Sequence, residues 1–141
     1  MPTDRIQVEG LNETLKAFKQ YGPDAARELR ASAKQMAGAV AARQASAGRG
    51  SSRQSALAAG TVRARSDRVP VIVAGGRSRN GMIFFGAEFG GRRRKTTQQF
   101  RPYTGHRGYW FYPTLRAMTP ALLEAYGNAL DKAARRWGAG G

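Results

Sequence analysis

The spacing of apolar residues in the first fifty positions predicts one short strand followed by two helices. Residues 4–9 alternate apolar and polar side chains, which predicts a half-buried strand. Residues 12–21 form the first predicted helix, and Gly22 and Pro23 separate it from a long alanine-rich helix over 23–47. The apolar stripe of the long helix consists of Leu29, Ala33, Met36 and Val40. Because this stripe includes small side chains, a partner helix can approach it closely.

The middle of the chain reads as a loop followed by strands. Residues 48–55 have no periodicity and the composition of a basic loop. Residues 57–66 are ambiguous between a helical turn and a strand. Residues 69–74 are rich in β-branched side chains, and 82–89 are the most apolar run in the sequence. The glycine-rich connection over 75–81 therefore predicts a hairpin of two strands.

A long irregular segment and a final helix complete the chain. Residues 90–108 are predicted to be a long basic loop, and loops of this length inside a domain are usually functional or disordered. The final helix is predicted over 113–137. Its apolar face consists of Leu115, Leu122, Tyr126, Leu130, Ala133 and Trp137.

The predicted elements together indicate one α+β domain over residues 1–141. Their order is β-α-α-β-β-β-α. The simplest packing places a small antiparallel sheet against the long alanine-rich helix and the C-terminal helix. A chain of this length can bury a modest core.

Charge changes the picture more than composition does. The net charge is +15, from 24 Lys and Arg against 9 Asp and Glu. Residues 43–107 carry fourteen of the basic residues but only two acids, Asp67 and Glu88. Such a field attracts nucleic acid, an anionic surface or an acidic protein partner.

The residues offer little for catalysis, metal binding or a membrane anchor. The sequence has no cysteine, which excludes disulfides, thiolate zinc sites and cysteine nucleophiles. The single histidine, His106, is expected to be an exposed loop residue, and there are no clustered carboxylates. No apolar stretch approaches the roughly 20 residues needed to span a bilayer. We therefore expect no enzyme activity, no cofactor, no metal site and no membrane partner.

The clearest charged feature is a run of four basic residues, accompanied by two arginines in the preceding glycine-rich turn. These residues are Arg92, Arg93, Arg94 and Lys95, with Arg77 and Arg79. Three interpretations stay open for them: a solvated loop, a contact with nucleic-acid phosphates, or a docking arm for an acidic protein surface.

Aromatic residues and one acid are the other candidate contact residues. The aromatic run comprises Tyr109, Trp110, Phe111 and Tyr112. We expect it to seal the sheet against the last helix or a neighbouring subunit, and stacking on bases is the alternative. Glu88, next to Phe89 at the end of an apolar run, is expected to point outward from a strand. Alternatively, it pairs with an arginine of a neighbouring subunit.

Three segments, in this order, resemble a known family. They are Gly-Leu-Asn-Glu-Thr-Leu at 10–15, Phe-Phe-Gly-Ala-Glu-Phe-Gly-Gly at 84–91, and Tyr-Trp-Phe-Tyr-Pro-Thr-Leu-Arg at 109–116. The set is similar to the small tail-component proteins of long-tailed, siphovirus-type bacteriophages, which include tail completion, neck and head–tail joining proteins.

The resemblance implies a structural virion protein that assembles in the host cytoplasm. Such proteins form homo-oligomeric rings, commonly sixfold, that join the head connector to the tail tube. The implied partners are the neighbouring neck and tail-tube proteins and the phage DNA in the lumen. The basic residues would then face DNA or an acidic neighbour, and Glu88, Phe89 and the aromatic run would lie at the subunit interface. The alternative function is a non-specific nucleic-acid-binding protein.

Overall fold

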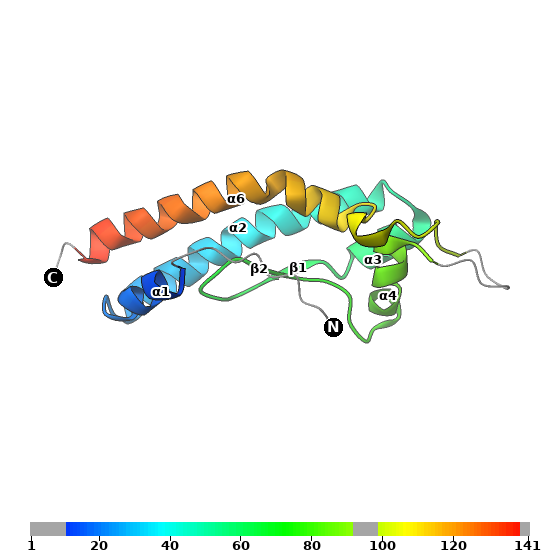
Figure 1. Cartoon of the computed structure of the whole chain (residues 1–141). Helices are drawn as coiled ribbons and strands as arrows, with labels where there is room; N and C mark the ends of the chain where they lie inside the picture. Colours follow the sequence, from blue (N-terminus) through cyan, green and yellow to red (C-terminus); the bar gives the residue numbers. More distant parts are fainter. Residues whose placement is uncertain (1–10, 92–98, 139–141) are drawn as a thin grey trace.

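Two long antiparallel helices run the length of the structure, a computed structural model that describes residues 11–91 and 99–138 (Figure 1). They are α2 (Pro23–Arg49) and α6 (Phe111–Ala133). The remaining elements gather at the two ends of this pair or lie along α2, which makes the molecule elongated.

Small side chains let α2 and α6 pack closely. The buried residues of α2 are Ala25, Leu29, Ala33, Ala37, Val40, Ala41, Gln44, Ala45 and Gly48. Three members of the predicted stripe are among them, and Met36 is half-buried. The stripe prediction is therefore confirmed, and dispersion and burial along it hold the two helices together.

A first apolar cluster closes the end of the molecule formed by α1, the start of α2 and the last turns of α6. Helix α1 (Leu11–Lys19) contributes Leu15 and Phe18, which pack with Leu29 of α2 and Tyr126 of α6. Beyond α6 the chain continues as a π-helical turn over Ala134–Gly138. The helices predicted over 12–21, 23–47 and 113–137 are thus confirmed, with ends shifted by a few residues.

The opposite end is built from three short helices and a 3-10 turn. These are α3 (Arg53–Ala59), α4 (Arg79–Met82), α5 (Phe84–Phe89) and η1 (Gly105–Arg107). Serines start two of the helices: the Ser55 amide donates to Ser52 Oγ at 3.0 Å, and the Gly81 amide donates to Ser78 Oγ at 3.1 Å. Such N-caps satisfy amides that have no partner within the helix.

The described strands form a two-stranded antiparallel hairpin that lies against α2. Strand β1 (Arg63–Arg65) pairs with β2 (Val71–Val73), with Ala64 opposite Ile72. The Tyr126 hydroxyl donates to the Arg68 carbonyl at 2.6 Å and ties the hairpin turn to α6. Burial raises the pKa of Tyr126 to about 12, so this hydroxyl stays protonated and donating at neutral pH.

The predicted α+β order, β-α-α-β-β-β-α, is wrong, because the described chain is mostly helical. Residues 82–89 were expected to be a strand, but Met82 ends α4, Ile83 is a turn residue and 84–89 form α5. Their buried members are Phe84, Ala87 and Glu88, which is helical spacing. The outward face of α5 carries Phe85, which is 46% exposed. Because α5 carries apolar side chains on both its buried and its outward face, its sequence does not show the helical period of 3.6 residues.

Two further expectations change with this correction. The hairpin partner of 69–74 is not 82–89 but the segment 57–66, which holds both the end of α3 and all of β1. The basic loop predicted over 48–55 shrinks to the three residues that separate α2 from α3. The strand predicted over 4–9 lies outside the described residues.

No helix in the described part of the chain is both long enough and apolar enough to cross a membrane.

Candidate functional site

The site is centred on a carboxylate that is buried at the start of α6. Glu88 lies in the last turn of α5 and is 0% exposed. Its Oε1 accepts the backbone amides of Tyr109 at 2.6 Å and Trp110 at 2.8 Å, and its Oε2 accepts the amide of Tyr112 at 2.8 Å. A side chain from another helix therefore satisfies two amides just before α6 and one in its first turn.

This arrangement replaces the usual N-cap of a helix. The N-cap position of α6 is Trp110, whose side chain makes no capping hydrogen bond. A negative charge at a helix N-terminus is favourable because the unpaired amides there carry a partial positive charge. The backbone carbonyl of Glu88 also accepts the Tyr109 amide, at 2.8 Å. Glu88 thus joins α5 to α6 through both its side chain and its main chain.

Two opposing effects act on the pKa of Glu88. Burial raises the pKa above its ordinary value of 4.5, and this is the larger effect. Hydrogen bonds from backbone amides at the start of α6, those of Trp110, Tyr112, Tyr109 and Phe111, lower the pKa. No Lys or Arg of the described chain forms an ion pair with Glu88. Within one chain the partners of Glu88 are therefore backbone amides rather than a guanidinium, and the expectation that it points outward is wrong.

Glycine is required where the chain passes closest to this carboxylate. Gly108 has φ +74°, and a Cβ there would lie 2.8 Å from Cδ of Glu88. Gly90 has φ +83°, and a Cβ there would lie 2.2 Å from the carbonyl oxygen of Pro102. Both backbone conformations disfavour any side chain. The Glu-Phe-Gly segment at 88–90 therefore crosses the chain around 102–108 at very short distance.

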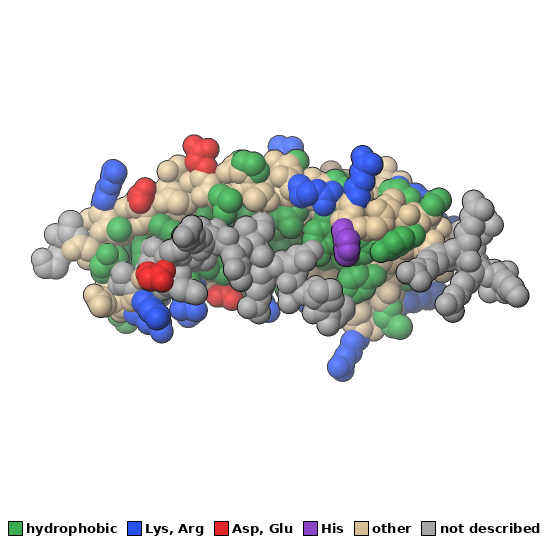
Figure 2. All heavy atoms as spheres, in the orientation of Figure 1, with side chains coloured by type: hydrophobic (Ala, Val, Ile, Leu, Met, Phe, Trp, Pro, Cys, Tyr) green, Lys and Arg blue, Asp and Glu red, His purple; other side chains and the backbone are tan. Residues whose placement is uncertain are grey.

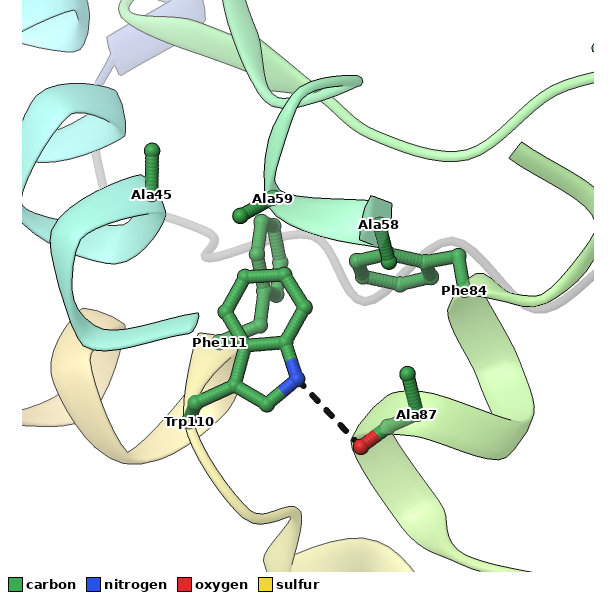
Figure 3. Packing of buried hydrophobic residues seen from close by; sticks show 7 residues of the cluster. All are labelled: Ala45, Ala58, Ala59, Phe84, Ala87, Trp110 and Phe111. Atoms are coloured by element: carbon green, nitrogen blue, oxygen red, sulfur yellow. Dashed lines mark hydrogen bonds between the residues drawn. The ribbon is translucent and has the colours of Figure 1, made fainter. Parts of the chain in front are cut away.

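The aromatic run forms the core beside Glu88. Trp110 and Phe111 are only 2% and 7% exposed, and each makes an edge-to-face contact with Phe84. The Trp110 indole N–H donates to the Ala87 carbonyl at 3.3 Å, as Figure 3 shows. The buried Gln44 side chain of α2 donates to the Phe111 carbonyl at 3.1 Å. Trp110 and Phe111, predicted as subunit-interface residues, are thus covered within the chain.

The other predicted interface aromatics are only partly covered. Phe89 and Tyr112 stack with ring centroids 5.5 Å apart, and Phe85 stacks on Phe89 at 6.3 Å. The Tyr109 hydroxyl donates to the Pro102 carbonyl at 2.6 Å. These side chains continue the core outward to the surface of α5.

Arg101 is a residue of the site that the sequence did not single out. Its guanidinium donates to Ser51 Oγ at 2.8 Å and to Ser55 Oγ at 3.2 Å, and it lies 3.7 Å above the ring of Tyr109. Cation–π stacking and the two serines fix the chain at Arg101, inside the 90–108 segment, on the corner between α2 and α3. No local signal in the sequence separates this arginine from the other arginines near it.

The end of the molecule around this site is strongly basic. We call it the basic pole and define it by residues 49–60, 75–91 and 99–116. Its only acid is the buried Glu88. Its exposed basic residues are Arg49, Arg53, Arg77, Arg79, Arg107 and Arg116. Figure 2 shows the acidic side chains of this face only on the half of the molecule away from the basic pole.

The basic pole also exposes most of the large apolar side chains found at the described surface. Leu57 is 46% exposed, Met82 73%, Phe85 46% and Tyr103 54%, whereas Leu123 of α6 lies outside the pole at 39%. Exposed apolar groups gathered at one end of a protein are typical of an interaction surface.

The remaining predicted site residues are distributed as follows. Arg77 and Arg79 are exposed at the start of α4, and Arg92, Arg93, Arg94 and Lys95 lie outside the described residues. The chain on either side of that run is held at the basic pole, because the Gly91 amide donates to the Arg101 carbonyl at 2.8 Å. His106 is exposed in η1, and the described residues contain no cluster of three or more potential metal ligands.

Comparison with protein-family models, curated proteins and solved structures finds no match to this chain.

Proposed function

We propose that this chain is a structural virion protein of the phage neck, forming a ring that joins the head connector to the tail tube around the DNA channel. The observation that carries the proposal is the joint at Glu88. Two of the segments that resemble the tail-component proteins, 84–91 and 109–116, form one hydrogen-bonded unit through this carboxylate. The hydrogen bonds of Glu88 give one physical reason why both segments occur in the same chain. This supports treating the two segments as one sequence signature.

The use of Glu88 supports a structural role over a catalytic one. Both of its carboxylate oxygens accept backbone amides, and the side chain is 0% exposed. A general acid or base must reach a substrate proton. A carboxylate whose oxygens hold a helix in place instead contributes rigidity to the basic pole.

The exposed apolar residues of the basic pole are the proposed contact with a second copy of the chain. Leu57, Met82 and Phe85 lie on α3, α4 and α5, three elements that pack together. A closed ring uses a heterologous interface, in which this patch meets a different surface of the next subunit. Trp110 and Phe111, buried within the chain, would support this patch from beneath rather than touch the neighbour.

The basic residues are the proposed contact with DNA in the lumen. Arg77 and Arg79 belong to a pole whose described part has no exposed acid, which favours an anionic partner. The same observation supports the second candidate, a free non-specific nucleic-acid-binding protein. The two candidate functions make different predictions. Only the neck protein must form rings, and only the neck protein is required for joining phage heads to tails.

Electron microscopy of the purified protein tests ring formation. We expect rings from the wild type and from L123S, which removes an exposed leucine outside the basic pole. M82S/F85S should remain folded by circular dichroism but lose the rings. If the wild type stays monomeric at every concentration, including in the presence of neighbouring neck proteins, the ring proposal is refuted.

Electron microscopy of lysates tests the neck role. Phage lacking this gene should accumulate filled heads and separate tails, and the wild-type gene supplied on a plasmid should restore joined particles. Intact, infectious particles from the deletion would exclude the joining role and favour the free nucleic-acid-binding protein.

A further inference from the structure

A surface cleft of about 560 Å³ opens at the basic pole beside the first turn of α6. It is lined by Thr104, Arg107, Gly108, Tyr109, Pro113 and Arg116. The two arginines are exposed and come from different elements, η1 and α6. None of the described residues that line the cleft is an Asp or a Glu.

The hydroxyl groups that line the cleft already donate hydrogen bonds within the chain. The donors that remain for a ligand are mainly those of the two arginines. The Thr104 hydroxyl donates to the Phe89 carbonyl, and the Tyr109 hydroxyl donates to the Pro102 carbonyl. The Arg116 guanidinium donates to the Arg107 carbonyl, which holds it at the cleft. A guanidinium carries five N–H donors, so this single bond leaves donors that face no other described partner.

Glu88 lies behind the cleft, on the far side of Gly108. Its oxygens are turned to the amides of Tyr109, Trp110 and Tyr112, and these amides offset its charge. The same bonds mean that the helix N-terminus itself is already occupied. A ligand in the cleft would therefore meet the two guanidinium groups, not the α6 amides.

We propose that this cleft binds a phosphate group of the DNA backbone. Guanidinium groups match phosphate oxygens in charge and planar geometry, and paired N–H donors give bidentate contacts. The Tyr109 ring and Pro113 supply apolar walls against which the adjoining sugar can pack. The cleft volume lies within the range of about 300–1,000 Å³ that is typical of ligand pockets. This inference rests on the proposed function, in which DNA passes the basic pole.

The test is the salt dependence of binding to a short fluorescein-labelled DNA duplex, measured by fluorescence anisotropy. Each phosphate contact contributes about 0.9 to the slope of log K against log salt. R107A/R116A should therefore lower the slope by about 1.8, and R107A alone by about 0.9. R107K/R116K keeps both charges and should retain the slope. The matched control R30A/R135A removes two exposed arginines from the other half of the molecule and should change the slope much less.

Each outcome decides the proposal. An equal change of slope in R107A/R116A and R30A/R135A, or no change in either, would overturn it. A loss of binding to a polyglutamate peptide with DNA binding intact would reassign the cleft to an acidic protein and also overturn it. R107A, which keeps the Arg116 side chain, guards against a folding defect in the double variant. Electron microscopy of the same proteins separates the two proposals. If the wild type forms rings but R107A/R116A leaves the salt slope unchanged, only the cleft proposal is rejected. If R107A/R116A lowers the slope but the wild type forms no rings, only the neck-ring proposal is rejected.

Discussion

Replacing Glu88 by alanine should lower the free energy of unfolding by about 3 kcal/mol. The substitution leaves the buried amide of Trp110 and the part-buried amide of Tyr112 without their acceptor. A buried orphan costs about 1–3 kcal/mol, and the part-buried one is expected at the low end of this range. The Tyr109 amide keeps a partner, because the backbone carbonyl of residue 88 still accepts it. Loss of the charge at the helix N-terminus adds up to about 1 kcal/mol, and relief of the buried charge offsets part of the total.

The conservative variant E88Q keeps the shape of the Glu88 side chain but removes its negative charge. Its side-chain oxygen can still accept two amides, but its NH2 group replaces an acceptor and faces the third donor. We expect a smaller loss, about 1–2 kcal/mol. E124Q, at an exposed position on α6, is the matched control and should stay within about 0.5 kcal/mol of the wild type.

Urea denaturation followed by circular dichroism and tryptophan fluorescence measures these differences. Trp110 is 2% exposed beside Glu88, so its share of the emission, measured together with that of Trp137, reports on the region around Glu88. A loss of about 3 kcal/mol corresponds to a fall in Tm of roughly 12 °C for a chain of this size. An E88A variant as stable as E124Q would refute the assignment of Glu88 as the cap of α6.

The pH dependence gives an independent check on the same carboxylate. Because burial raises the pKa of Glu88 above 4.5, the folded state binds its proton more tightly than the unfolded state does. Its contribution to stability is therefore fully present below pH 4.5 and is lost as pH rises through the raised folded pKa. The stability of the wild type relative to E88Q, which does not titrate, should fall over this window. A rise instead would mean that the amide hydrogen bonds outweigh burial.

Three further substitutions test the packing. G90A should destabilise by more than about 2 kcal/mol in thermal unfolding, because its Cβ would overlap the Pro102 carbonyl at a positive φ. G38A, inside α2 with no atom within 4 Å of the added Cβ, should instead stabilise by about 0.5–1 kcal/mol, and destabilisation would contradict the packing around α2. Y126F should cost about 1 kcal/mol through loss of the bond to the Arg68 carbonyl, and faster hydrogen exchange confined to the β1–β2 turn should accompany it.

The long helices were readable from the sequence because their information is local. The stripe from Leu29 to Val40 recurs at helical spacing over several turns, and the final helix shows the same kind of pattern around Tyr126. The concentration of positive charge in residues 43–107 was equally visible, since it depends only on composition.

The joint at Glu88 was not readable in this way, because its partners are more than twenty residues further along the chain. Alone, Glu88 looked like an outward strand residue among apolar neighbours, and α5 looked like a strand because Phe85 and Phe89 make its outer face apolar too. Only the crossing of α5 over the start of α6 turns an apparently exposed acid into a buried cap. Local periodicity therefore identified the helices, whereas burial and hydrogen bonding between distant segments, which no local pattern encodes, created the site.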